Sequence, residues 1–165
     1  AAEKMTTLLI GKGFRRFPFL VKNMSYNVDR KRHEGFCRAL IKNGISEKDQ
    51  LFYNGSIRME FLDAIIENII SKKVECIICG DDEICTMVMS RLQAEGYRIP
   101  KDVAIASLYN STNLDCYSPA VTAVSVAASQ MGGAAVRQLI QRLRGENYEK
   151  KTMLDYDILF RKSTN

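Results

Sequence analysis

Residues 74–83 have the sequence Val-Glu-Cys-Ile-Ile-Cys-Gly-Asp-Asp-Glu, and this stretch decides the fold class. A short apolar run of this kind is typical of a strand buried on both faces in a parallel sheet. Asp81 or Asp82 can cap the helix that follows, which we expect to end near Gly96, with Pro100 beyond it. A buried strand that leads directly into a capped helix predicts a sheet whose strands alternate with helices.

The same alternation continues on both sides of this stretch. We expect further strands at residues 15–21, 50–54, 103–108, 122–125 and 153–161, and helices at residues 1–12, 29–43, 58–72 and 127–144. Strands separated by helices of this length are joined by right-handed crossovers, which give a parallel sheet covered on both faces. The sequence therefore predicts an α/β fold with a doubly wound parallel sheet, whose ligands bind beyond the carboxyl ends of the strands.

Length and composition narrow the class of protein further. A chain of 165 residues that is 46% hydrophobic and 26% charged is large enough for one domain with a core. Its net charge of +5 comes from scattered residues, which does not favour a nucleic-acid surface, and we see no membrane span or signal segment. Five cysteines, an odd number, indicate reduced thiols in a cytoplasm. Cys76 and Cys79 should face opposite sides of their strand and so cannot share a metal.

Few residues suggest chemistry by themselves. The acidic run 81–83 fits helix capping, hydrogen bonding to a ligand, or a metal site for which only Asp29 offers another obvious ligand. His33 lies within a predicted helix, where a solvated or packing role is favoured over a catalytic one. Arg32 lies near the ligand-binding edge, and its guanidinium suits vicinal hydroxyls or carboxylates, although a solvated charged turn is equally compatible. These residues indicate a binding domain without an evident catalytic group, metal or cofactor.

Seven segments of the sequence together resemble one protein family. Residues 94–104 read Ala-Glu-Gly-Tyr-Arg-Ile-Pro-Lys-Asp-Val-Ala, which is similar to a signature of the effector-binding domains of LacI/GalR transcriptional regulators. The other six matching segments are residues 9–16, 32–40, 79–85, 118–124, 131–135 and 161–164. Each segment is short, but their common order covers nearly the whole chain and makes the resemblance specific.

The resemblance implies a type I periplasmic-binding-protein-like fold, in which two flavodoxin-like subdomains close on a small effector. It assigns residues 14–125 and 153–163 to the C-terminal subdomain and residues 1–13 to a remnant helix of the N-terminal one. Residues 127–145 would form a helix that normally packs on that N-terminal subdomain. We therefore expect its apolar side to pack elsewhere, to exchange between chains, or to be poorly ordered.

The implied function is effector sensing and dimerisation in a cytoplasmic DNA-binding repressor. The effector would be a sugar or sugar derivative, and operator DNA would be bound only through a helix-turn-helix that this sequence does not contain. A sugar-binding receptor of an ABC transporter shares the fold, but the free cysteines, the lack of a signal segment and the closing Arg161-x-Ser163-Thr164 favour a repressor. An α/β enzyme that uses Asp81 and Asp82 around a metal is the third hypothesis.

Site residues follow from the resemblance position by position. Arg32 falls on the arginine that binds effector hydroxyl or carboxylate groups, and Tyr26 and Val28 fall on two ligand-facing positions of the preceding loop. Asp81 replaces an asparagine that often contacts a sugar, which keeps the acceptor and loses the amide donor.

Two further positions depart from the family pattern. Ile57 occupies the region of an aromatic platform, so no stacking ring is expected there. Tyr109 replaces the aspartate that grips the ligand, and a tyrosine can stack or donate one hydrogen bond but cannot accept two. A phosphosugar or another small molecule is therefore favoured over a plain hexose. The implied dimer interface is formed by Ile84, Met87, Val88, Cys116 and Tyr117.

Overall fold

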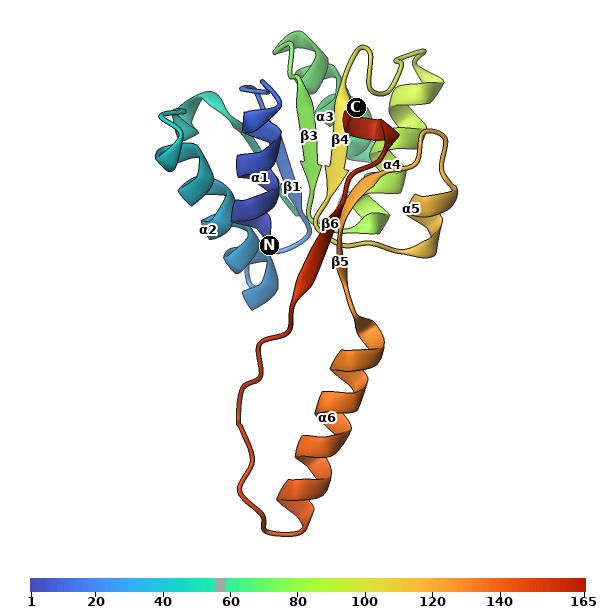
Figure 1. Cartoon of the computed structure of the whole chain (residues 1–165). Helices are drawn as coiled ribbons and strands as arrows, with labels where there is room; N and C mark the ends of the chain where they lie inside the picture. The colour runs from blue at the N-terminus through green and yellow to red at the C-terminus, as the bar shows by residue number, and fades with distance from the viewer. Residues whose placement is uncertain (56–58) are drawn as a thin grey trace.

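The computed structural model describes residues 1–55 and 59–165 (Figure 1). Its strands are β1 (Pro18–Val21), β2 (Leu51–Asn54), β3 (Cys76–Cys79), β4 (Ala104–Ser107), β5 (Thr122–Val126) and β6 (Tyr156–Leu159). Its helices are α1 (Ala2–Gly11), α2 (Asn27–Lys42), α3 (Met59–Ser71), α4 (Asp82–Ala94), α5 (Thr112–Cys116) and α6 (Ala128–Leu143). Two short 3₁₀ turns, η1 (Glu47–Asp49) and η2 (Lys162–Thr164), complete the described chain.

The strands form one sheet in the order β2-β1-β3-β4-β5-β6, which confirms the doubly wound α/β fold. The first five strands pair in parallel, as predicted from their crossover helices. The last strand does not follow that prediction, because β6 runs antiparallel to β5, with Ala123 opposite Leu159. After β5 the chain runs out along α6 and comes straight back into β6. A strand that returns in this way pairs antiparallel with the one before it, since only parallel neighbours need a crossover connection.

Helices cover both faces of the sheet. α1 and α2 cover one face, where Phe19 and Ile78 point from the strands towards Met5 and Phe36. α3, α4 and α5 cover the other face, where Ile77 packs in the second part of the core. Successive residues of β3 point to opposite faces of the sheet. Cys76 and Cys79 therefore lie on different faces, as predicted.

α1 belongs to this body of the chain, which corrects the assignment of residues 1–13 to another subdomain. Met5 and Leu9 are fully buried in the core beneath α2. Outside the core, the Glu3 carboxylate bonds to Arg38 at 3.0 Å and to Lys42 at 2.5 Å, both on α2. The helix is therefore an integral layer of this sheet and has not lost a partner.

α6 behaves differently from every other helix described here, because none of its residues is buried. Figure 1 shows α6 and the segment that returns from it projecting away from the body, at the carboxyl ends of the parallel strands. Large apolar side chains stay exposed along it, among them Leu139 and Leu143, the latter 78% exposed. Of the three alternatives, packing elsewhere on the body of the chain does not occur, while an exchange between chains and poor order of this helix stay predictions.

Two local expectations also need correction. The stretch 110–119, expected to be a polar loop, contains the short helix α5. Asp29 does not cap α2, because that helix begins at Asn27 and its N-cap residue, Tyr26, makes no side-chain cap bond. By contrast, Asp81 is confirmed as the cap of α4, since its Oδ1 accepts a hydrogen bond from the Ile84 backbone N–H at 2.9 Å.

Candidate functional site

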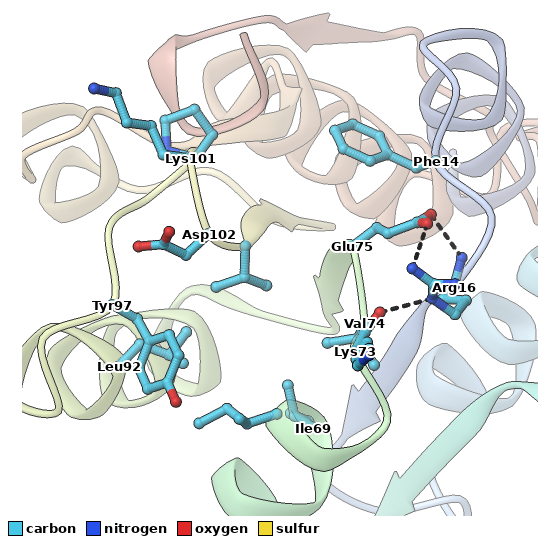
Figure 2. A pocket seen from close by; sticks show the side chains of 13 residues that line it. Phe14, Arg16, Ile69, Lys73, Val74, Glu75, Leu92, Tyr97, Lys101 and Asp102 are labelled. Carbon is cyan, nitrogen blue, oxygen red and sulfur yellow. Dashed lines mark hydrogen bonds and ion pairs between the residues drawn. The ribbon is translucent and has the colours of Figure 1, made fainter.

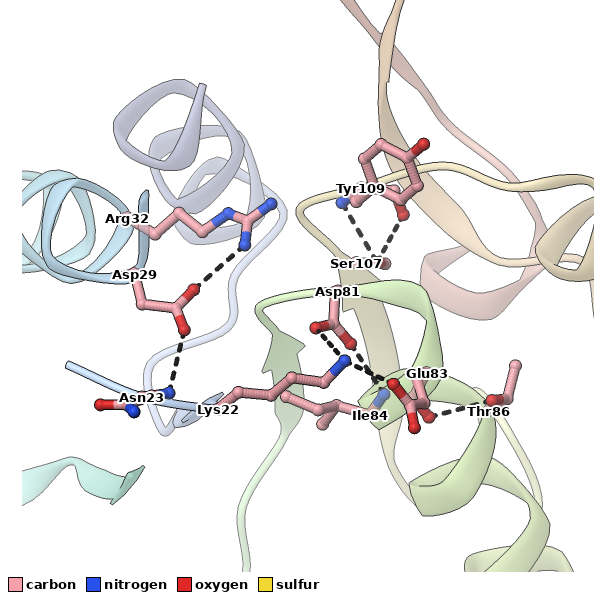
Figure 3. Close-up of polar contacts among 10 residues, drawn as sticks. All are labelled: Lys22, Asn23, Asp29, Arg32, Asp81, Glu83, Ile84, Thr86, Ser107 and Tyr109. Carbon is pink, nitrogen blue, oxygen red and sulfur yellow. Dashed lines mark hydrogen bonds and ion pairs between the residues drawn. The ribbon is translucent and has the colours of Figure 1, made fainter. Parts of the chain in front are cut away.

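The carboxyl ends of β1, β3 and β4 bring the predicted ligand residues to one edge of the sheet. These three strands are neighbours, so the loops that follow them are neighbours too. Figure 3 shows Arg32 near the start of α2, Asp81 at the start of α4 and Tyr109 just after β4 on this edge. We call this edge, defined by Lys22, Arg32, Asp81 and Tyr109, the effector edge.

Arg32 lies half-buried on the effector edge, next to a buried carboxylate. Its NH1 group bonds to Asp29 Oδ1 at 3.1 Å, with side-chain exposures of 19% for Arg32 and 6% for Asp29. The other oxygen of Asp29 accepts the Asn23 backbone N–H at 3.0 Å. Within the described residues, the Nε and NH2 groups of Arg32 have no protein partner. Arg32 is thus held in place on one side and retains donors for a ligand on the other.

Lys22 is a residue of this edge that our sequence analysis missed. Its Nζ lies 3.0 Å from Asp81 Oδ2 and 2.5 Å from Glu83 Oε2. The ion pair with Glu83, helped by the one with Asp81, raises the pKa of Lys22 and keeps it charged. The only signal in the sequence was a lysine placed directly after the apolar strand residues 19–21.

Asp81 is consequently engaged on both oxygens. One caps α4 through Ile84 N and the other binds Lys22. We predicted that Asp81 accepts a hydrogen bond from a ligand. To do so, an oxygen of its carboxylate must either accept the ligand in addition to its present partner, Ile84 N or Lys22, or give up that partner. The ammonium group of Lys22 lies beside Asp81 and is, after Arg32, the second positively charged group of the effector edge.

Tyr109 projects from the loop after β4, and its side chain is 42% exposed. The loop itself is fixed, because the Ser107 hydroxyl donates to the Tyr109 carbonyl at 2.7 Å and accepts its N–H at 3.2 Å. The next residue, Asn110, accepts a hydrogen bond from Arg161 at 2.9 Å. The ring of Tyr109 is thus presented from a fixed backbone, as a stacking or hydrogen-bonding group would need to be.

Three other predicted ligand positions can be placed only in part. Tyr26 and Val28 flank the start of α2 and are both exposed, at 58% and 51%. Ile57 lies outside the described residues.

The predicted dimer residues divide into two groups. Ile84 and Val88 are buried in the core of the chain itself, so they cannot meet a partner in this conformation. Met87 and Tyr117 are only partly buried, and Cys116 is exposed. A partner contact on this face would therefore have to use Met87, Cys116 and Tyr117.

Three of the cysteines, Cys37, Cys76 and Cys79, lie in surroundings that disfavour a thiolate. Burial raises the pKa of Cys76 and of Cys79, and burial raises the pKa of Cys37 to about 11. The His33 ring packs beside Phe19 and Phe52, at centroid distances of 6.0 and 4.3 Å. Within residues 1–55 and 59–165, no three His, Cys, Asp or Glu side chains are arranged to hold a metal ion. In the same residues, no helix has the length and apolarity needed to cross a membrane.

Comparison with known proteins identifies the family. The family model described as "Periplasmic binding protein-like domain" matches residues 6–164. The HTH-type transcriptional repressor PurR of Erwinia tasmaniensis is 25% identical over 153 residues, which cover 92% of this chain and 45% of the relative. The PurR repressor of Vibrio atlanticus is 25% identical over 163 residues, which cover 96% and 48%. The chain thus spans about half the length of the curated relatives it matches.

Solved structures of regulators share the fold. The transcription regulator CcpA of Lactococcus lactis superposes with a TM-score of 0.90 at 24% identity, over 100% of this chain and 61% of that chain. A sugar-binding LacI-family regulator from Escherichia coli, solved with phosphate, gives a TM-score of 0.84 at 20% identity, over 98% and 59%. The regulator CelR, solved with cellobiose, gives 0.85 at 24% identity, over 98% and 50%.

The family match covers nearly the whole sequence, and the repressors named above align over more than nine-tenths of the chain. The chain therefore belongs to the periplasmic binding protein-like domain family, and the proteins it resembles are transcriptional regulators.

Proposed function

We propose that this chain is the effector-sensing and dimerising part of a LacI-family transcriptional repressor, and that it binds a small molecule at the effector edge. The observation that carries the proposal is Arg32. Its guanidinium is mostly buried, is oriented by the buried Asp29, and keeps its Nε and NH2 donors unused within the described residues. A fixed guanidinium with unused donors suits a ligand rich in acceptor oxygens.

The ligand class follows from the groups around Arg32. Tyr109 supplies an exposed ring, while Lys22 is already paired with Asp81 and Glu83, and Asp81 is bound on both oxygens. The free donors of this edge therefore belong to Arg32, and a guanidinium of this kind favours a sugar derivative with an acidic or phosphate group over a plain hexose. One regulator of this fold was solved with phosphate and another with cellobiose, which supports phosphates and sugars as the compounds to test.

The rest of the repressor would lie beside the effector edge. The exposed side chains of Tyr26, Val28 and Tyr109 face away from the core on the same edge from which α6 projects. A second subdomain placed there would cover these side chains and the apolar side of α6, and would close over the ligand. DNA binding would belong to a further segment, as in the HTH-type relatives.

The test is a thermal-shift screen of the full-length natural protein against hexoses, phosphosugars and nucleobases, followed by calorimetric titration of the compound that stabilises it. We expect Arg32→Ala to abolish the titration. Arg38→Ala is the matched control, since it removes an arginine from the same helix whose side chain is 52% exposed and binds only surface carboxylates. Equal affinity of wild type and Arg32→Ala would refute the proposed site.

A further inference from the structure

A cavity of about 470 Å³ lies at the opposite edge of the sheet from the effector edge. Its wall is formed by the residues that precede β1, β3 and β4 and by the ends of α3 and α4, as Figure 2 shows. Its volume is within the range of small-molecule sites. Since β3 has four residues, the length of a strand, about 13 Å, separates this edge from the effector edge. Neither Arg32 nor the α6 arm contributes to it.

Both carboxylates that line the cavity are already saturated by protein donors. Glu75 binds the Arg16 guanidinium at 2.8 Å, and its second oxygen accepts the backbone N–H groups of Arg15 and Arg16 at 2.6 and 3.2 Å. Asp102 receives two guanidinium bonds and one backbone bond from Arg98, at 2.7 to 2.9 Å. The bond to Arg98 lowers the pKa of Asp102 to about 2. Each acid thus receives three protein bonds, and its charge is compensated by an arginine, Arg16 or Arg98.

Two lysines of the same cavity have no such partner. Lys73 and Lys101 line it, and neither makes an ion pair within the described part of the chain. Lys73 has a backbone φ of 50°, and its carbonyl accepts the Arg16 Nε–H at 2.6 Å, which holds its backbone at the rim. Lys48 and Lys72 line an adjoining cavity, so the positive charge extends along this edge.

The wall between these charges is apolar. Phe14, Ile70, Tyr97 and Pro100 are partly exposed around the cavity. A second cavity of about 310 Å³ shares Ile70 and Tyr97 with it but is lined by Asp63, Glu67 and Glu95. The only cation among its lining residues, Arg91, is already paired with two of those acids. An anion is therefore favoured in the first cavity and opposed in the second.

We propose that the cavity between the ends of α3 and α4 is a second ligand site, which takes a small molecule that joins an aromatic ring to one anionic group. The ring packs on Ile70, Tyr97 and Pro100. The anion lies at the rim, where the exposed side chain of Lys73 and that of Lys101, which extends outwards in Figure 2, can turn to meet it. The site is independent of the effector edge, so it exists whether or not that edge binds a sugar derivative.

The probe is anilinonaphthalene sulfonate, which combines an aromatic body with a single sulfonate. It is titrated into the 165-residue chain and followed by amide NMR spectra. We expect saturable shifts at Val74, Tyr97 and Val103, and weaker binding at those amides, by about fivefold, in Lys73→Glu and in Lys101→Glu. Lys150→Glu, the same charge change on an exposed lysine outside the cavity, should alter binding by less than about twofold.

A third variant tests the shape of the cavity separately from the charge of its lysines. Ile70→Trp places a larger side chain in the wall of the cavity without changing its charge. It should remove the probe-induced shifts at Val74 and Val103, while the rest of the NMR spectrum remains that of a folded chain. The proposal is overturned if the shifts are confined to α6 or to the effector edge, if Lys73→Glu and Lys101→Glu behave like Lys150→Glu, or if no saturable shift occurs at millimolar probe. Because Arg32→Ala leaves this cavity intact, the probe still binds that variant even if the proposed effector site is wrong.

Discussion

Asp29 shows how one buried carboxylate can organise the effector edge. It joins the backbone of Asn23, in the loop after β1, to the guanidinium of Arg32, one turn further along α2. A buried charge is tolerated only when it is paired and hydrogen-bonded, and this one is both. Asp29 therefore fixes the loop and the proposed ligand-binding arginine together.

Asp29→Asn should destabilise the chain by about 1–3 kcal/mol, because it leaves the Arg32 guanidinium mostly buried without its counter-charge. The measurement is the free energy of unfolding in urea. Glu34→Gln serves as the control, since it breaks ion pairs with Lys31 and Arg38 on the exposed side of the same helix and should cost less than about 0.5 kcal/mol. Equal losses in the two variants would contradict the role of Asp29.

His33 gives the stability a dependence on pH. Burial lowers the pKa of His33, against the opposing effect of Glu47 and Glu34. The folded chain therefore binds fewer protons at this ring than the unfolded chain, whose histidine has a pKa of about 6.5. Stability is thus greatest above that value and is lost as the pH falls through the lower folded pKa.

His33→Phe should reduce this loss, because a phenyl ring can pack against Phe19 and Phe52 without titrating. The measurement is the difference in unfolding free energy between pH 7 and pH 5.5, in wild type and variant. His33 is the only histidine in the sequence, so the change in slope reports this residue. An unchanged slope would show that His33 titrates alike in the folded and unfolded chains.

Among the elements, α6 is a regular helix that buries no residue and touches the returning segment through Gln138, which donates to Thr152. Exposed apolar side chains such as Leu139 and Leu143 form a surface that water does not favour, and such surfaces drive association. The core, by contrast, consists of residues from the sheet and from α1 to α5. Contacts of α6 should therefore affect the association of chains and leave the stability of the body unchanged.

The double variant Leu139→Lys/Leu143→Lys should lower self-association of the 165-residue chain in sedimentation velocity, with an unfolding free energy within about 0.5 kcal/mol of wild type. Ser129→Lys/Gln130→Lys is the charge-matched control, because both positions are exposed and polar. It should leave self-association unchanged. A loss of stability well above 1 kcal/mol in the leucine variant would instead show that α6 packs into a core.

The sequence predicted those elements whose signals are local. The strand at β3 and the cap of α4 follow from the residues themselves, since an apolar run and an adjacent aspartate need no distant partner. The first strand begins at Pro18 and not at Arg15, because Arg15 and Arg16 turn to bind Glu75, some 60 residues away in the sequence. Patterns of hydrophobicity contain no information on such distant pairs.

The candidate site shows the same limit. Arg32, Asp81 and Tyr109 were found because each follows a recognisable strand or motif, and the structure brings them to one edge. Lys22 was missed because its significance depends on Asp81 and Glu83, which lie on another strand–helix unit. The assignment of α1 failed for a related reason, since an amphipathic helix does not specify which body its apolar side contacts.

On the scale of the whole molecule, the sheet separates three surfaces. The effector edge and the α6 arm lie at the carboxyl ends of the strands. The 470 Å³ cavity proposed as a second ligand site lies at their amino ends. The side formed by α4 and α5 carries the partly exposed Met87 and Tyr117 and the exposed Cys116. A dimer formed through this third surface would leave both ligand sites open.

Met87→Glu should therefore convert a dimer into a monomer at about 10 µM chain, because it places a charge in the centre of an apolar contact. The measurement is sedimentation equilibrium, carried out in the Leu139→Lys/Leu143→Lys background so that association through α6 does not contribute. Ile41→Glu is the control, since Ile41 is an exposed apolar residue of α2 on the other side of the sheet. If both variants stay dimeric, the contact lies elsewhere. If the background chain is already monomeric, association depends on α6 and on the segment that would cover it.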